Sequence, residues 1–157
     1  MDEQAEKPRG ELTTRTLAMP ADTNPSGDIF GGWVLAQMDI AGGIFAGQRA
    51  EGRVATIAVF AMKFIRPVYV GDVMCVYCEL AREGRTSIAV NVEAWALRGR
   101  IGDRVKVTEG LFTFVAIDQE GRPRTLPARP VRVAHEHNGD ASTPSGAPTA
   151  SAPAASK

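Results

Sequence analysis

The stretch that decides the fold is residues 31–48, GGWVLAQMDIAGGIFAGQ. It is long enough for about five helical turns, and it is apolar around nearly its whole circumference, which is typical of a helix enclosed by other structure. Gly42 and Gly43 each cost about 1 kcal/mol relative to alanine in a helix, so we expect another backbone or a ligand to approach closely there. The stretch predicts one central, largely buried helix.

Five segments with strand patterns surround this helix in the sequence, and no second helix is predicted. One precedes it at 12–19, and the others follow at 54–65, 72–82, 87–98 and 104–118. The segment that starts at residue 87 alternates apolar and polar side chains, as a half-buried antiparallel strand does. Turn residues separate the segments. The order predicts an α+β fold, with an antiparallel sheet wrapped around a single helix.

The composition of the 157-residue chain argues against several classes of protein. Lys and Arg number 18 and Asp and Glu number 18, so the formal charge is zero and no nucleic-acid or membrane-surface partner is expected. No apolar run reaches the roughly 18 residues of a membrane span, and the charged N-terminus does not resemble a signal peptide. Cys75 and Cys78, three apart on a strand, point to opposite faces and are expected to stay reduced. These features predict a cytoplasmic protein.

The chain divides into three parts. Residues 1–11 are predicted to be a flexible N-terminus and residues 12–127 a single folded domain. Residues 128–157 are rich in Ala, Pro and Ser, and such a segment cannot bury enough apolar surface to offset its ordering entropy, so we expect a disordered tail. The only histidines, His135 and His137, fall in this tail.

Asp39 is the leading candidate for chemistry. Its neighbours three and four positions away on the helix are Leu35, Ala36, Gly42 and Gly43, none of which is a cation. A buried charge without a partner costs several kcal/mol, so we expect one mainly where it performs a reaction. Asp39 could act as a general base or as a nucleophile.

Other catalytic arrangements are missing from the sequence. No histidine lies in the predicted core and no G-x-S-x-G turn is present, which argues against a serine hydrolase. No Cys, His or Asp motif with metal-ligand spacing is present, so no metal is expected. Gly31-Gly32 matches neither the dinucleotide nor the phosphate-loop pattern, so no nucleotide cofactor is expected.

The start of the helix supplies further candidates. Gly31 and Gly32 would place backbone N–H groups where a helix N-terminus favours developing negative charge, as in an oxyanion hole. Alternatively, the glycines only allow the preceding chain to turn sharply into the helix. Asn24 could orient water or a carbonyl group, or could simply form an Asn-Pro turn. Asp28 is expected to cap the helix.

Cations and hydroxyls near strand ends suggest an anion site. Such groups are often ordinary solvated surface, but together they would suit the phosphates of an extended ligand such as a coenzyme A derivative. The candidate residues are Lys63, Arg66, Arg85, Thr86 and Ser87.

The sequence resembles the hotdog-fold acyl-CoA thioesterases, and within them the bacterial YciA type, related to animal cytosolic acyl-CoA hydrolases. The resemblance covers roughly residues 12–127. The motifs that carry it are TLAMPADTN at 16–24, GDIFGGW at 27–33 with QMD at 37–39, FIRPV at 64–68 with VGD at 70–72, GRTS at 84–87, and TEGLFTFVA at 108–116.

The resemblance implies a hotdog fold in which two protomers build each active site and three dimers associate. It implies that Asp39 is the catalytic carboxylate, that Asn24 faces it from the partner protomer, and that amides near Gly31 and Gly32 polarise the thioester carbonyl. The products would be a free carboxylic acid and coenzyme A, with no cofactor.

Two residues depart from the family pattern. Relatives commonly have an acidic residue at the position of Phe60, and Asn or Thr at the position of Lys63. Both departures lie on the strand after the helix, where they bear on acyl preference and on coenzyme A contacts.

Two alternatives to a thioesterase remain. A hotdog hydratase or dehydratase would rely on a core histidine, which this sequence lacks. A non-catalytic acyl-CoA-binding or sensing protein would gain nothing from the pair Asn24 and Asp39.

Overall fold

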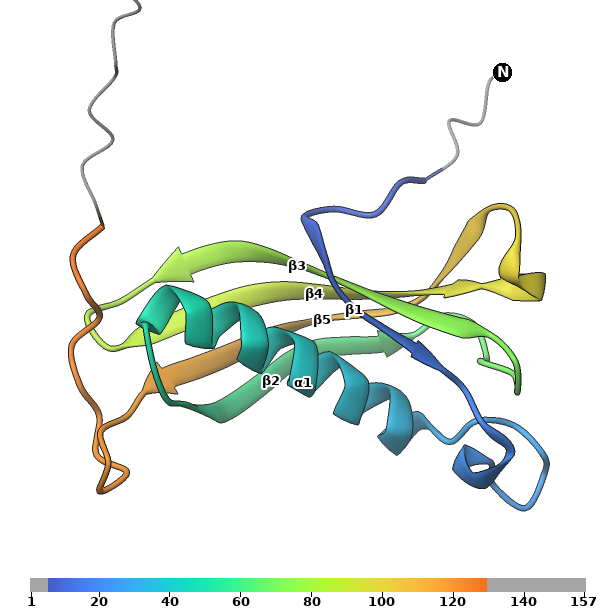
Figure 1. Cartoon of the computed structure of the whole chain (residues 1–157), viewed down its shortest axis with the longest axis horizontal. Coiled ribbons are helices and arrows are strands. Elements are labelled where there is room, and N and C mark those ends of the chain that lie inside the picture. The colour runs from blue at the N-terminus through green and yellow to red at the C-terminus, as the bar shows by residue number, and fades with distance from the viewer. Residues whose placement is uncertain (1–5, 130–157) are drawn as a thin grey trace, which may run out of the picture.

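The structure, a computed structural model, describes residues 6–129 (Figure 1). The predicted tail at 128–157 lies almost wholly outside the described residues, as do both histidines. Within the described residues, no helix is both long and apolar enough to cross a membrane. The elements, in chain order, are β1 (Glu11–Leu17), a 3-10 turn η1 (Pro20–Asp22), α1 (Gly31–Ala50), β2 (Val54–Phe64), β3 (Val73–Glu83), β4 (Ser87–Leu97), η2 (Arg98–Arg100) and β5 (Arg104–Ala116).

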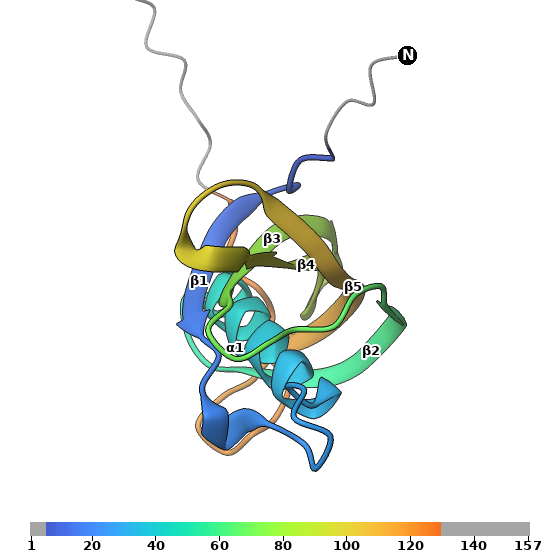
Figure 2. The same ribbon diagram turned by 90° about the vertical axis from the view of Figure 1, so that its right-hand side faces the viewer.

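The five strands form one antiparallel sheet in the order β1-β3-β4-β5-β2. Figure 2 shows the sheet curving around α1, with β1 and β2 as its two edges. The predicted α+β class and the wrapped antiparallel sheet are confirmed, and the element ends differ from the predicted ones by at most two residues. This arrangement places the middle of α1 against the concave face of the sheet.

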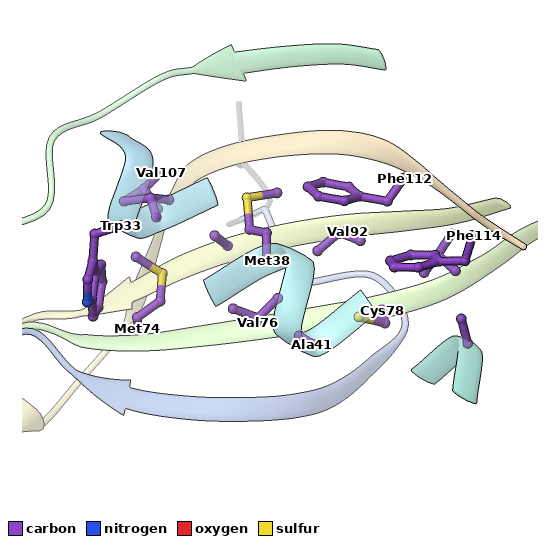
Figure 3. Packing of buried hydrophobic residues seen from close by; sticks show 14 of the residues in the cluster. Trp33, Met38, Ala41, Met74, Val76, Cys78, Val92, Val107, Phe112 and Phe114 are labelled. Atoms are coloured by element: carbon purple, nitrogen blue, oxygen red, sulfur yellow. The ribbon is translucent and has the colours of Figure 1, made fainter. Parts of the chain in front are cut away.

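The core fills the space between α1 and the concave face (Figure 3). Phe112 and Phe114 of β5 stack with ring centroids 6.4 Å apart, and both are buried together with Met38 of α1. Cys78 belongs to this core and Cys75 does not, although both are buried free thiols. The two cysteines therefore point to opposite faces of β3, as predicted.

Gly42 allows the helix to approach β5 closely. A Cβ atom on Gly42 would lie 2.8 Å from the Phe114 ring, whereas a Cβ atom on Gly43 would lie 3.8 Å from it. The first distance is a clash and the second an ordinary contact. Packing therefore explains Gly42, and it does not explain Gly43.

The helix is covered on one side only. Leu35, Ile40 and Ile44 are 37%, 52% and 44% exposed in the chain. The helix, predicted to be enclosed on most sides by other structure, is covered on one side within a single chain, because a single sheet can cover only one side of a helix. An apolar strip is left facing outward.

The outer face of β4 is more covered than its alternating pattern predicted. Glu93 and Trp95 are each only 2% exposed. The Glu93 carboxylate accepts hydrogen bonds from Arg9 Nε at 2.6 Å, Trp95 Nε1 at 3.0 Å and Lys106 Nζ at 3.2 Å. Burial alone would raise the pKa of Glu93, but these hydrogen bonds outweigh it and hold the pKa below its usual value. A buried ionic cluster therefore lies on this face.

Candidate functional site

The loop before α1 is organised by Asn24. The side-chain oxygen of Asn24 accepts hydrogen bonds from the N–H groups of Ser26 at 2.9 Å and Asp28 at 3.1 Å, and its backbone N–H donates to the carbonyl of Asp28 at 2.7 Å. These bonds form an Asx turn. The side-chain NH₂ of Asn24 donates to no residue in the described part of the chain. Asn24 therefore shapes the loop and keeps a donor for another group.

The helix begins with free N–H groups. Phe30 occupies the N-cap position and no side chain caps the helix, so the prediction that Asp28 is the cap is wrong; Asp28 bonds to Asn24 instead. The first turn contains no acidic residue. The N–H groups of Gly31 and Gly32 have no acceptor within residues 6–129, and both glycines are exposed. They point outward at the positive end of the helix dipole, which suits a developing oxyanion.

Asp39 lies two turns further along α1. Its Oδ1 atom accepts a hydrogen bond of 2.7 Å from the hydroxyl of Thr56 on β2. The side chain is half-buried, and no cation of the described chain pairs with it. The expectation of a buried carboxylate without a partner is therefore wrong for the single chain, since Asp39 lies beside the uncovered strip of the helix and has a neutral partner.

A cavity of about 280 Å³ lies next to Asp39. Apart from the carboxylate and the Thr56 hydroxyl, its walls are apolar or backbone. The lining residues are Gly32, Leu35, Ala36, Asp39, Thr56, Val59 and Phe112.

One chain keeps the candidate catalytic groups apart. Gly31 and Asp39 are eight residues apart on one helix, which corresponds to about 12 Å along its axis. A carbonyl oxygen held by the Gly31 N–H group is therefore out of hydrogen-bonding range of the Asp39 carboxylate in the same chain. Asn24 does not line the cavity beside Asp39.

A second groove, of about 350 Å³, opens at the start of the helix. It lies between α1, the end of β2 and the loop that follows β2. Its lining residues are Ile29, Gly31, Val34, Phe64, Ile65, Arg66, Pro67, Val68 and Val107.

The five residues predicted to bind coenzyme A lie in two separate groups. Both β2 and β4 pair with β5, so positions along β5 can be used to compare them. Lys63 of β2 pairs with Glu109, and Ser87 of β4 pairs with Val115. Six residues of strand, or about 20 Å, separate these positions. A single chain therefore does not bring the two groups together. The first group is Lys63 and Arg66 at the end of β2, and the second is Arg85, Thr86 and Ser87 at the turn between β3 and β4.

Phe60 lies away from both cavities. It pairs with Leu111 of β5, on the face opposite to Phe112 and the helix. Lys63 pairs with Glu109 and shares this outer face. The departure from the family pattern at Phe60 thus does not alter the lining of either cavity.

Thr56 is the site residue that the sequence analysis missed. It stands between Ala55 and Ile57 in a largely apolar strand, and this isolated hydroxyl was the only available signal. Across residues 6–129, no group of three or more His, Cys, Asp or Glu side chains is arranged to hold a metal ion.

Comparisons with known proteins identify the family of this chain. A family model described as the thioesterase superfamily matches residues 26–102. The acyl-CoA thioester hydrolase YciA of Salmonella typhimurium is 54% identical over 125 residues, which span 78% of this chain and 94% of that protein. The crystal structure of a hexameric thioesterase from Yersinia pestis has a TM-score of 0.75 and 52% identity, covering 78% of this chain and 100% of that one.

A more distant solved structure contains ligands. An acyl-CoA hydrolase from Staphylococcus aureus, in complex with butyryl coenzyme A and coenzyme A, has a TM-score of 0.67 and 27% identity, covering 73% of this chain and 70% of that one. In two further structures of that hydrolase, alanine replaces an asparagine or, fifteen positions later, an aspartate.

Proposed function

This chain belongs to the thioesterase superfamily as a hotdog-fold acyl-CoA thioesterase of the YciA type, and from that premise we propose how its residues hydrolyse acyl-CoA to a carboxylic acid and coenzyme A. The observation that carries the proposal is the pair of free N–H groups at Gly31 and Gly32, together with the carboxylate of Asp39. Donors aimed at the carbonyl oxygen and a base or nucleophile aimed at the carbonyl carbon are what thioester hydrolysis requires.

The complete site combines two copies of the chain. The Gly31 and Gly32 N–H groups of one copy hold the carbonyl oxygen, and Asp39 comes from the second copy, because about 10–12 Å of helix separates these groups within a chain. Asn24 offers its free NH₂ donor across the same interface. The spacing of fifteen positions between Asn24 and Asp39 equals that of the asparagine and aspartate replaced in the Staphylococcus aureus hydrolase.

Asp39 acts either as a general base or as a nucleophile. As a base, it takes a proton from water while the hydroxide oxygen bonds to the carbonyl carbon, and the tetrahedral intermediate then expels the thiolate, which takes up the proton. As a nucleophile, its oxygen displaces the thiolate directly and water hydrolyses the resulting anhydride. In both cases Thr56 holds Oδ1 and leaves the other carboxylate oxygen free to react.

The apolar strip on α1 supports self-association. Leu35, Ile40 and Ile44 are exposed in the chain, and Leu35 lines the cavity beside Asp39. Exposed apolar patches of this kind mark protein contacts. We place a second copy over this strip and propose a hexamer built from three dimers, the assembly size stated for the Yersinia pestis relative.

Several further features belong to the same proposal. Residues 12–127 form the catalytic domain. The enzyme works in the cytoplasm without a metal or cofactor. Coenzyme A phosphates are bound by Lys63, Arg66, Arg85, Thr86 and Ser87, contributed by more than one chain.

Release of free thiol from a panel of acyl-CoA esters tests the proposal. The wild-type protein should turn over acyl-CoA, and Asp39→Asn should lower kcat by at least about a hundredfold, as loss of a general base does. Undiminished turnover by Asp39→Asn would reject the mechanism. Binding of acyl-CoA without turnover by the wild type would favour the sensing protein instead.

A further inference from the structure

The ring of Phe64 lies against the start of the helix. Phe64 is the last residue of β2, and a Cβ atom on Gly31 would lie only 3.2 Å from two of its ring atoms. The ring is nevertheless 59% exposed. A large apolar side chain thus borders the N–H groups that hold the thioester carbonyl in the proposed mechanism, and it remains accessible in the chain.

Phe64 also forms one wall of the groove that opens at Gly31. Most other side chains of this groove are apolar, and Arg66 is the only charged residue among them. The Arg66 guanidinium donates a hydrogen bond of 2.9 Å to the carbonyl of Lys106, so it is already partly engaged. The groove therefore combines apolar side chains with some polar atoms of the backbone and of Arg66, and it begins where the carbonyl is held.

The backbone of the groove wall is occupied by hydrogen bonds within the chain. The Ile65 N–H group donates to a carbonyl of β5 at 2.8 Å, and the Ile29 N–H group donates to the Val68 carbonyl at 3.2 Å. The Pro67 carbonyl accepts a hydrogen bond of 2.7 Å from Arg98. Few polar groups remain for the two amides of a pantetheine arm, which would be left unpaired at a cost. An alkyl chain carries no such cost.

We infer that this groove binds the acyl chain of the substrate and that Phe64 determines which chain lengths are accepted. The inference rests on the proposed function, since it takes the carbonyl to sit at Gly31. Each methylene that enters the groove exchanges water for the apolar side chains of Ile29, Val34 and Val68, and it passes the Phe64 ring on the way in. The coenzyme A arm leaves the carbonyl in the other direction.

Two substitutions of Phe64 test the inference on the full-length enzyme. Values of kcat/KM are measured for acetyl-, butyryl-, octanoyl- and palmitoyl-CoA. Phe64→Ala removes a groove wall and should lower the octanoyl-to-acetyl ratio of kcat/KM by about tenfold relative to wild type. Phe64→Trp narrows the entrance and should reduce turnover of the two longer substrates while acetyl-CoA remains within about twofold.

Phe60→Ala is the matched control. Phe60 is on the same strand, has the same side chain and is 53% exposed, but it faces away from the groove. The octanoyl-to-acetyl ratio of kcat/KM for Phe60→Ala should equal that of wild type. Phe64→Leu keeps an apolar side chain and should fall between wild type and Phe64→Ala, which separates loss of the wall from a general folding defect.

The panel distinguishes the possible failures. If both Phe64 variants change kcat/KM by the same factor for every chain length, the groove holds the coenzyme A arm and the inference is wrong. If Phe60→Ala shifts the ratios as much as Phe64→Ala, the effect is not specific to the groove and the inference also fails. If the wild type hydrolyses none of the four esters, the proposed function itself has failed.

Discussion

The hydroxyl of Thr56 donates a hydrogen bond of 2.7 Å to Oδ1 of Asp39, which ties edge strand β2 to the middle of α1. The bond fixes the rotation of the carboxylate, because a carboxylate held through one oxygen presents the other in a defined direction. Since the helix side of this contact is otherwise apolar, Thr56 is the one neutral donor that the described chain offers to Asp39.

Thr56→Val keeps the shape of the side chain and removes this donor. We expect kcat to fall about tenfold, with a smaller change in KM, because a hydrogen bond to a charged group contributes about 1.5 kcal/mol. Thr56→Ser should retain most of the activity. Thr113→Val makes the same change on β5, where the hydroxyl is buried without a partner in the described chain, and should leave kcat unaltered. Equal activity of Thr56→Val and wild type would show that Asp39 needs no such support.

Mixing two inactive variants tests whether the site is shared between copies. Asp39→Asn and Asn24→Ala are each expected to be nearly inactive. After the two are unfolded and refolded together, half of the dimers are mixed, and each mixed dimer contains one intact site, so activity should return to about a quarter of wild type. The control is each variant refolded alone. No recovery in the mixture would mean that Asn24 and Asp39 act within one chain.

The contacts to coenzyme A are tested by a substrate that lacks phosphates. Arg85→Ala should raise KM for an acyl-CoA about tenfold, since a charge-assisted hydrogen bond to phosphate is lost. The KM for the matching acyl-pantetheine should stay the same. Arg122→Ala, on an exposed turn where Arg122 pairs with Asp118, is the control for loss of a surface cation. An equal rise in KM for the acyl-CoA and for the acyl-pantetheine would show that the lost contact does not involve the phosphates.

Alanine at the two helix glycines should have opposite effects on stability. Gly42→Ala places a methyl group 2.8 Å from the Phe114 ring, so we expect the free energy of unfolding to fall by about 1–2 kcal/mol despite the better helix propensity of alanine. In Gly43→Ala the new methyl group lies 3.8 Å from its nearest neighbour, and the free energy of unfolding should rise by about 0.5–1 kcal/mol. Urea unfolding of both variants measures the difference. A stabilised Gly42→Ala would show that the Phe114 ring moves aside at little cost.

The ionic cluster on the outer face of the sheet should make stability depend on pH. Hydrogen bonds from Arg9, Trp95 and Lys106 lower the pKa of Glu93 in the folded protein, so its contribution is fully present above the unfolded pKa of about 4.3 and is lost as the pH falls further. Glu93→Gln should cost about 1–2 kcal/mol at pH 7, because Arg9 and Lys106 lose a charged hydrogen-bond partner while Lys106 keeps its ion pairs with Glu109 and Glu6.

Thermal unfolding between pH 7 and pH 3 measures this dependence. The melting temperature of Glu93→Gln should fall less steeply below pH 5 than that of wild type. Glu79→Gln, an exposed carboxylate on neighbouring β3, should follow the wild-type curve. Parallel curves of melting temperature against pH for wild type and Glu93→Gln would mean that Glu93 does not cause the loss of stability at low pH.

Local patterns in the sequence predicted the elements and the sheet well. The length and composition of residues 31–48 and the turn residues between strands are short-range signals, and the helix and all five strands appear where those signals place them. The free thiols Cys75 and Cys78 followed from strand geometry in the same way.

Other features depended on contacts that no local pattern encodes. The apolar circumference of α1 indicates that the helix is covered, but it does not say whether its own sheet or a second copy covers Ile40. The hydrogen bond between Thr56 and Asp39 joins residues 17 apart, and the burial of Glu93 depends on Arg9, 84 residues away. Neither partner could be identified without the folded chain.

The length of helix between Gly31 and Asp39 has a consequence for how the enzyme responds to its own concentration. In a single folded chain, the N–H donors at Gly31 and the carboxylate of Asp39 are too far apart to act on one thioester. Catalysis therefore requires two copies to associate, and the associated fraction depends on the protein concentration. Specific activity should then decline on dilution below the dissociation constant of the pair, while the fold of each chain persists. Substitutions at Ile44, which is exposed on the strip and lies outside the Asp39 cavity, would change turnover at a given protein concentration by shifting that dissociation constant.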